Sequence, residues 1–305
     1  MQETFLHYIS KIKLVINMNY EITGKTRLTG LLGSPVAHSI SPQMHNEAFR
    51  QLGLDYVYLA FDVKPERLKE AVLGLKAAGI CGFNLTMPLK VHIIPLLDEL
   101  TPAARLAGAV NTVIIKGERM IGHNTDGTGY MHSVLDAGFT ITGKKMTLLG
   151  AGGAATAICV QAALDGVASI DMYKRKNASW DKTLQFCQQI TLETGCKIRL
   201  CDISDETSLA ESLSNSAILT NATNVGMAPD TKVSPIPDAS LLPKDLIVSD
   251  IIYNPQETLL LKQAKQAGCP HFNGLYMLLY QGAAAFTCWT GQEMPVALIK
   301  DKYFK

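Results

Sequence analysis

From residue 27 onward, apolar positions recur at every second residue in some segments and at every third or fourth residue in others. The first period is typical of half-buried strands and the second of amphipathic helices. Strand patterns in the first part of the chain cover 27–33, 55–63 and 81–87, and a hairpin pattern covers 110–124 with its turn at Gly117. Helical patterns cover 41–53, 65–79, 90–97 and 101–108. Strands and helices in alternation predict an α/β fold for this part of the chain.

The predicted helix at 41–53 carries signals at both of its ends. Ser41 is expected at the N-cap, Pro42 at the first helical position and Gly53 at the stop. The helix should therefore begin directly after a short polar loop and end sharply.

A second series of strand and helix patterns follows a predicted helix at 126–138. Its first element, MTLLGAGGAATAICVQAALDG, is an apolar strand, a glycine-rich turn and an alanine-rich helix. Further strand patterns, separated by helical sequence, lie at 168–173, 196–202, 217–223 and 246–254. Such a series predicts a doubly wound parallel sheet, the Rossmann fold.

The glycine-rich turn has the G-x-G-x-x-A spacing of a dinucleotide-binding turn. Gly150 permits the tight turn, Gly152 lets a pyrophosphate approach the backbone, and Ala155 keeps the helix close to the strand. The pyrophosphate is expected at the helix N-terminus, where free N–H groups and the helix dipole favour an anion. Glycine spacing alone is a weak signal, but the strand before the turn and the helix after it strengthen it.

Length and composition bound the class of protein. At 305 residues the chain exceeds the size at which single cores stop growing, so two domains are expected. The 28 basic and 27 acidic residues form no basic face for nucleic acid, and no apolar run approaches the ~18 residues of a membrane span. The N-terminus lacks a signal-peptide pattern. The seven cysteines are scattered and never spaced C-x-x-C, which indicates reduced thiols, a cytoplasmic location and no metal site.

The choice between NAD and NADP depends on the end of the second Rossmann strand. An NAD site usually has an acidic residue there, whereas this chain has Lys174, Arg175 and Lys176, which suit a 2′-phosphate. Asp171 lies inside the strand and Asp181 well beyond it. We therefore expect NADP, with NAD as the alternative cofactor. The purely structural alternative is that the three cations lie in a solvated turn and bind no phosphate.

Polar residues crowd between apolar ones in GFNLTMPLK, and the same chemistry returns in GHNTDGTGY. The pattern fits a half-buried strand with a wet face, and it also fits one wall of a pocket for a polyhydroxylated ligand. Lys90 alone could be an exposed lysine at a helix start, and Asp126 alone could be a helix N-cap. Together, these residues are the expected partners of many ligand hydroxyls.

These segments resemble the shikimate dehydrogenase family, including its quinate/shikimate branch. The motifs that carry the resemblance are GSPVAHSISPQMHN, GFNLTMPLK, GAVNT with GHNTDGTG, and GLYMLLYQGAAAFTCWTG. Their order and spacing, from about Tyr20 to the C-terminus, make the match more specific than the glycine turn alone. The resemblance implies reversible reduction of 3-dehydroshikimate to shikimate by a nicotinamide cofactor.

The resemblance also implies roles for particular residues. Lys90 would exchange the proton at the reacting oxygen, with Asp126 beside it as an orienting group. The residues that would bind the substrate are Ser39, Ser41, Asn84, Thr86, Lys90, Asn111, Asp126, Tyr253 and Gln281. The residues that would contact the cofactor are Gly150, Ala151, Gly152, Gly153, Ala154, Lys174, Arg175, Lys176, Ile251 and Gly274. The family pattern at 174–176 is Asn-Arg-Thr, of which only Arg175 is kept.

The fold we expect is an α/β substrate-binding domain at 19–125 joined to a Rossmann domain at 126–273. Helices at 275–305 are expected to pack back onto the first domain and to carry Gln281 to the cleft between the domains. A small-molecule substrate is the expected partner, and a homodimer remains open. Alternatives are a quinate dehydrogenase with shikimate as its secondary substrate, and a cofactor-sensing regulator without catalysis.

Two further features have weaker signals. The histidines at 38, 45, 123 and 132 are alternative acid/base groups, because histidine titrates near neutral pH, but no pair has metal-ligand spacing. Residues 1–18 show no clear period and are expected to add little to the core, although Leu14, Val15 and Ile16 could form an edge strand.

Overall fold

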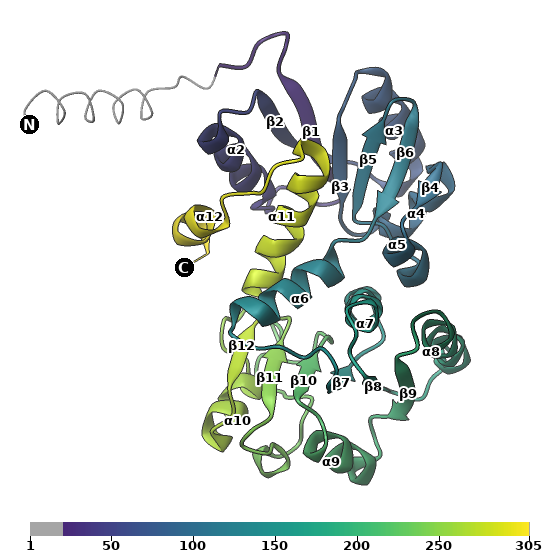
Figure 1. Cartoon of the computed structure of the whole chain (residues 1–305), viewed down its shortest axis with the longest axis vertical. Helices are drawn as coiled ribbons and strands as arrows, with labels where there is room; N and C mark the ends of the chain where they lie inside the picture. The colour runs from purple at the N-terminus through teal and green to yellow at the C-terminus, as the bar shows by residue number, and fades with distance from the viewer. Residues whose placement is uncertain (1–20, 305) are drawn as a thin grey trace, which may run out of the picture.

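The computed structural model describes residues 21–304, so the predictions for residues 1–18 lie outside the described residues. Two six-stranded sheets form the centres of two units (Figure 1). This arrangement confirms the predicted α/β class. Among the described residues, no helix is long and apolar enough to span a membrane.

The first sheet is mixed, with the strand order β2-β1-β3-β5-β6-β4. Its strands are β1 (Arg27–Gly33), β2 (Tyr56–Asp62), β3 (Gly82–Leu85), β4 (Glu99–Leu100), β5 (Thr112–Lys116) and β6 (Arg119–His123). β1 is parallel to β2 and β3, whereas β5 is antiparallel to β3 and β6. The predicted hairpin is present, and Gly117 has a positive φ of 59° at its turn.

The helices of this first unit mostly lie where the helical pattern predicted them. They are α2 (Ser41–Leu52), α3 (Leu68–Ala77) with the 3-10 turn Pro65–Arg67, α4 (Leu89–His92) with the 3-10 turn Ile94–Leu96, and α5 (Pro102–Ala107). Gly53 ends α2 in a left-handed conformation, as predicted. Ser41 as N-cap is wrong: Ile40 occupies the cap position, and the hydroxyl of Ser39 accepts the backbone N–H of Ser41.

The second sheet is entirely parallel, with the order β12-β11-β10-β7-β8-β9. Its strands are β7 (Lys145–Leu149), β8 (Ser169–Lys174), β9 (Lys197–Asp202), β10 (Ile218–Asn221), β11 (Ile247–Asp250) and β12 (His271–Asn273). Its helices are α6 (Asp126–Asp136), α7 (Gly153–Leu164), α8 (Trp180–Thr194), α9 (Glu206–Ser214) and α10 (Leu259–Ala267), with the 3-10 turn Ala239–Leu241. This order is that of the doubly wound Rossmann fold, with its switch point between β7 and β10. The short strands β4 and β12 had no predicted counterpart.

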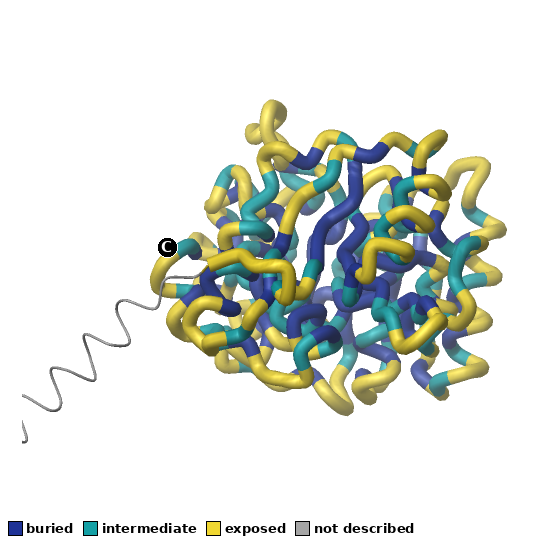
Figure 2. The backbone as a smooth tube through the Cα atoms, turned by 90° about the horizontal axis from the view of Figure 1, so that it is seen from above, coloured by how far each residue is buried: buried dark blue, intermediate teal, exposed yellow. Residues whose placement is uncertain are grey.

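Apolar clusters cover both faces of each sheet, and buried segments run through the middle of the molecule beneath exposed loops (Figure 2). The C-terminal helices α11 (Leu275–Thr290) and α12 (Val296–Tyr303) share one core with β1, α2 and β2. Phe286, Trp289 and Ile299 are buried there with Met44 and Tyr58. α11 also packs along α6 and runs beside both units (Figure 1). The domain bounds at 125 and 273 stay a prediction. The strands β1 to β6 lie before residue 125, and the strands β7 to β12 lie between 126 and 273.

Candidate active site

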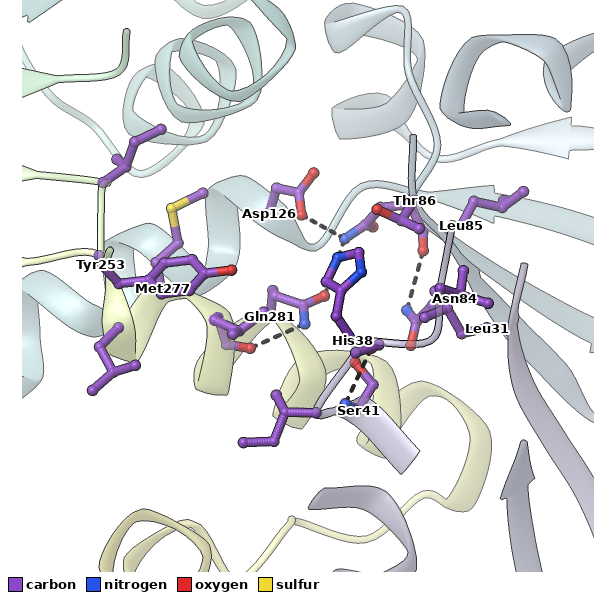
Figure 3. Close-up of a pocket in the computed structure, with 18 of the residues that line it drawn as sticks. Leu31, His38, Ser41, Asn84, Leu85, Thr86, Asp126, Tyr253, Met277 and Gln281 are labelled. Atoms are coloured by element: carbon purple, nitrogen blue, oxygen red, sulfur yellow. Dashed lines mark hydrogen bonds between the residues drawn. The ribbon is translucent and has the colours of Figure 1, made fainter. Parts of the chain in front are cut away.

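A cavity of about 410 Å³ lies between the two units (Figure 3). Its wall is formed by residues of both units and of α11, including every substrate-binding residue that the sequence predicted. Those residues are Ser39, Ser41, Asn84, Thr86, Lys90, Asn111, Asp126, Tyr253 and Gln281. Ile251 and Gly274, predicted to contact the cofactor, line the same cavity. The tertiary structure therefore brings together residues spread over more than two hundred positions.

An ion pair between Lys90 and Asp126 lies on this wall. The Nζ atom of Lys90 donates to Oδ2 of Asp126 at 2.6 Å, although the residues are 36 positions apart. The side chains are 31% and 15% exposed, so the pair is partly shielded but open to the cavity. The other carboxylate oxygen accepts a hydrogen bond of 2.8 Å from the side-chain amide of Asn111. Asp126 does not cap α6 with its side chain, because both carboxylate oxygens have partners in the site.

The polar stretch around β3 forms the next part of the wall. The side chain of Asn84 is buried against the sheet, where it donates to the carbonyl oxygen of Asn111 at 3.1 Å. Met87, three residues on, is 77% exposed. Asn84, Leu85 and Thr86 line the cavity at the end of β3, and α4, which begins at Leu89, adds Lys90.

The facing wall comes from α11 and from the segment after β11. Gln281 reaches the cavity from α11, and its Oε1 atom lies 3.4 Å from the Asn111 amide. Tyr253 follows β11 and is 47% exposed (Figure 3). Gly274 caps the N-terminus of α11, and an added Cβ there would lie 1.9 Å from the carbonyl oxygen of Ile251. A side chain at that position would therefore disturb the contact that joins α11 to the sheet.

The glycine turn has the geometry that the spacing predicted. Gly150 has a φ of 112° and lies against the backbone of Ala222, so a larger residue there would be strained. Added Cβ atoms at Gly152 and Gly153 would meet nothing within 4 Å. Open space in front of the N-terminus of α7 fits an anionic pyrophosphate. Ala155 is fully buried between helix and sheet.

The three cations at the end of β8 differ in their surroundings. Lys174 is buried, and its ammonium donates to Asn177, Ser179 and Thr183 at 3.1, 2.7 and 3.2 Å. This side chain holds the β8–α8 loop together and does not point to solvent as a free phosphate ligand would. Arg175 and Lys176 are exposed on the same loop.

The histidines differ in their surroundings. His38 lines the cavity and lies among its labelled polar residues (Figure 3). Burial lowers the pKa of His123, whose ring lies 3.1 Å from the Thr101 hydroxyl, and His45 is fully buried away from the cavity. His132 is exposed on α6, where it contacts the ring of Tyr280.

Sequence reasoning missed the apolar part of the cavity wall. Its members are Leu31, Pro35, Val36, Ile40, Leu85, Leu275, Met277, Leu278 and Phe304. Along the chain they are indistinguishable from core positions, because an apolar residue on a strand or helix is ordinarily buried in packing. The predicted glycine turn and the cations after β8 are not part of this cavity wall.

A Rossmann sheet with an open glycine turn, beside a cavity that holds a lysine–aspartate pair, defines a dinucleotide-dependent oxidoreductase. Comparison with known proteins agrees. The model described as the shikimate dehydrogenase substrate binding domain matches residues 31–113, and that of the shikimate 5'-dehydrogenase C-terminal domain matches residues 274–302. The chain belongs to the shikimate dehydrogenase family.

Individual relatives match almost the whole chain. The shikimate dehydrogenase (NADP(+)) of Listeria monocytogenes serotype 4b is 51% identical over 283 residues, which cover 93% of this chain and 97% of the relative. The quinate/shikimate dehydrogenase of Escherichia coli O17:K52:H18 is 44% identical over 281 residues, covering 92% and 98%. The crystal structure of shikimate 5-dehydrogenase from Listeria monocytogenes with shikimate and NAD has a TM-score of 0.90 at 51% identity, covering 92% of this chain and 97% of that one.

Proposed function

We propose that this protein catalyses the reversible reduction of 3-dehydroshikimate to shikimate, with NADP as its preferred cofactor. The observation that carries the proposal is the 2.6 Å ion pair of Lys90 and Asp126 on the wall of a cavity shared with the Rossmann unit. Such a position lets one side chain serve a proton transfer while a cofactor bound on the other side exchanges hydride.

The bound nicotinamide supplies the hydride chemistry, and the residues of this chain handle the proton. In the reducing direction, the ammonium of Lys90 donates a proton to the developing alkoxide oxygen, and in the oxidising direction its amine takes the proton back. Asp126 holds Nζ of Lys90 toward the cavity and accepts a substrate hydroxyl. Because both carboxylate oxygens already have partners, the aspartate is restricted to one orientation.

The remaining polar wall suits a small hydroxylated carboxylic acid. Ser39 and Ser41 present hydroxyl groups at the start of α2, and Thr86 and Asn111 present donors and acceptors from the opposite side. Gln281 closes the cavity from α11, and Tyr253 closes it from the segment after β11. We assign to this set the substrate carboxylate and ring hydroxyls.

The preference for NADP is supported by Arg175 and Lys176, the exposed cations after β8. A guanidinium can bind a 2′-phosphate through two parallel hydrogen bonds. The Listeria relative named above carries NADP(+) in its name, whereas its solved counterpart contains NAD. Asn177, where an acidic residue would favour NAD, accepts a hydrogen bond from Lys174.

A second candidate function is quinate oxidation, which the quinate/shikimate dehydrogenase of Escherichia coli supports. Quinate and shikimate are both hydroxylated ring carboxylates that this polar wall can bind. The non-catalytic alternative is set aside, because the chain belongs to an enzyme family and has the lysine–aspartate pair in its cavity.

One assay tests the proposal. The purified protein is incubated with shikimate or quinate, each with NAD or NADP, and the absorbance of the reduced nicotinamide is followed. We expect the highest kcat/KM with shikimate and NADP. A higher kcat/KM for quinate would replace the proposed substrate, and a higher kcat/KM with NAD would replace the proposed cofactor.

A further inference from the structure

Behind the cavity wall, a continuous chain of hydrogen bonds runs from a buried tyrosine to Asp126. The hydroxyl of Tyr58 donates to Oδ1 of Asn84 at 2.9 Å, and Nδ2 of Asn84 donates to the Thr112 hydroxyl at 3.0 Å. That hydroxyl donates to Oδ1 of Asn111 at 3.0 Å, and Nδ2 of Asn111 donates to Asp126 at 2.8 Å. Tyr58 and Thr112 themselves do not line the cavity. They have no role in the function proposed above.

Fixed backbone groups set the orientation of both asparagine amides in this chain. The carbonyl oxygen of Asn111 can only accept, so Nδ2 of Asn84 must face it at 3.1 Å and Oδ1 must face Tyr58. The backbone N–H of Thr125 can only donate, so Oδ1 of Asn111 must face it at 2.7 Å and Nδ2 must face Asp126. All donors therefore point toward the carboxylate of Asp126, and aligned hydrogen bonds strengthen one another.

Thr112 is the junction of this chain because of its place in the sheet. It lies directly opposite Asn84 in the antiparallel register of β3 and β5, so their side chains share one face. Its side chain is fully buried. The hydroxyl accepts from Asn84 and lies 3.0 Å from Oδ1 of Asn111 and 3.1 Å from the Thr125 hydroxyl, so it joins the two asparagines as a group that is both donor and acceptor.

The far end of the chain is held from α2 by two consecutive residues. The ring of His45 stacks on the ring of Tyr58 with centroids 4.4 Å apart and an interplanar angle of 7°. Nδ2 of Asn46 donates to the backbone oxygen of Tyr58 at 2.9 Å, and Oδ1 of Asn46 accepts from the backbone N–H of Tyr58 at 2.8 Å. Burial raises the pKa of Tyr58, which keeps its hydroxyl protonated as a donor. The tyrosine hydroxyl that begins the hydrogen-bond chain is therefore held in a fixed position.

We propose that Thr112 is a positioning residue for the reaction: its hydroxyl joins Asn84 to Asn111 and so orients the amide that holds Asp126 and, through it, Lys90. This inference rests on the proposed function of Lys90 and Asp126. Without the hydroxyl, Asn84 loses an acceptor and Asn111 loses a donor, although the shape of the site is kept by valine. The ion pair would then sample more positions, and small displacements of reacting groups lower the rate strongly.

The kinetic test compares Thr112→Val, Thr112→Ser and the matched control Thr29→Val. Thr29 is also fully buried in this sheet, but its hydroxyl donates only to the carbonyl oxygen of Val57, at 3.1 Å. We expect Thr112→Val to lower kcat about tenfold or more with KM changed by less than about threefold, as for a misplaced catalytic group. Thr112→Ser should recover most of kcat, and Thr29→Val should resemble wild type. Unchanged kcat in Thr112→Val, no recovery in Thr112→Ser, or an equal loss in Thr29→Val overturns the proposal.

A second measurement is independent of turnover. In the ¹⁵N-labelled full chain, Thr112→Val should shift the side-chain amide signals of Asn84 and Asn111, while Thr29→Val should leave both in place. Unshifted amide signals in Thr112→Val contradict the hydrogen-bond chain. If Thr112→Val does not fold, Tyr58→Phe tests the hydrogen-bond chain instead. Removal of the Tyr58 hydroxyl should shift the side-chain amide signals of Asn84 and lower kcat. If the wild-type protein shows no turnover, the proposed function is overturned. The amide signals would still test the hydrogen-bond chain on their own.

Discussion

At the scale of single residues, the site depends on pairs that are distant along the chain. Lys90 belongs to a short helix after β3, whereas Asp126 begins α6 after the hairpin. Each could be explained by local structure alone, as an exposed lysine and a helix cap. Their contact at 2.6 Å inside the cavity gives both a common role.

Replacement of Lys90 by alanine tests the proton-transfer role. Lys90→Ala should lower kcat by about 100-fold or more, as expected for a lost general acid/base, with a much smaller effect on substrate affinity. Steady-state kinetics and direct binding of shikimate separate the two effects. Lys69→Ala, on the exposed surface of α3, is the matched control. A folded Lys90→Ala enzyme with a near wild-type rate would show that the assignment is wrong.

His45 gives a prediction on pH dependence. It is fully buried, neither ring nitrogen has a hydrogen-bond partner among the described residues, and burial lowers its pKa to about 3. An unfolded histidine titrates near 6.5, so between pH 6.5 and about 3 the unfolded state binds a proton that the folded state does not. Stability is therefore lost as the pH falls below 6.5, and this loss levels off near pH 3.

His45→Phe should remove this dependence while keeping an aromatic ring against Tyr58. From pH 7 to pH 5, the wild type should lose about 2 kcal/mol more free energy of unfolding than His45→Phe. Urea unfolding at the two pH values measures both losses. The same loss in both proteins would mean that His45 is protonated in the folded state or does not contribute.

At the scale of elements, the hydrogen bonds of one lysine hold the β8–α8 loop, and two other cations lie exposed on that loop. The buried ammonium of Lys174 has three oxygen partners, which equals the number of its N–H donors. The loop is thereby closed over Lys174, and Arg175 and Lys176 are left on its surface. The prediction that Lys174, Arg175 and Lys176 contact the cofactor stays a prediction, in which Arg175 and Lys176 are the two cations exposed to solvent.

Arg175→Ala should weaken NADP binding about tenfold or more, because a charge-assisted contact with the 2′-phosphate is lost. NAD lacks that phosphate, so its affinity should change little. KM values for both cofactors, with Lys182→Ala on the exposed side of α8 as control, test this. Equal losses for NAD and NADP would favour a solvated turn.

At the scale of the whole molecule, α6 lies between α7, which follows the glycine turn, and α11, which carries Gln281 (Figure 1). Glycines permit both contacts. An added Cβ at Gly127 would lie 2.3 Å from the carbonyl oxygen of Ala157 in α7. One at Gly129 would lie 2.5 Å from the backbone nitrogen of Gln281 in α11. Asp126, at the start of α6, is therefore linked through helix packing to the helices that carry the proposed cofactor and substrate sites.

Gly129→Ala should push α11 away from α6 and displace Gln281. We expect a loss of about 1–3 kcal/mol in stability, as for overpacking, together with a raised KM for the substrate. Thermal melts and kinetics measure these changes. Gly74→Ala, inside α3 where an added Cβ meets nothing within 4 Å, should be neutral or stabilising by about 0.5–1 kcal/mol. A tolerated Gly129→Ala would show that the two helices can shift without cost.

The sequence by itself determined the local elements and the cofactor turn. Alternating apolar positions and end signals such as Gly53 depend on neighbours in the chain, so they could be predicted without a fold. The positive φ of Gly150 likewise follows from a turn that closes within a few residues. The polar residues of the site were found because their motifs resemble a known family.

Only the tertiary structure decided which of these residues meet. Ser41 is the first residue of α2, with Ile40 at the cap position, and the ammonium of Lys174 donates to oxygens of the loop that follows it. Thr112 ends the GAVNT motif, but no role was predicted for it, since that role depends on the β3–β5 register that puts it opposite Asn84. Hydrogen bonds between side chains act over about 3 Å, so residues far apart in sequence acquire partners only when sheets and helices have packed.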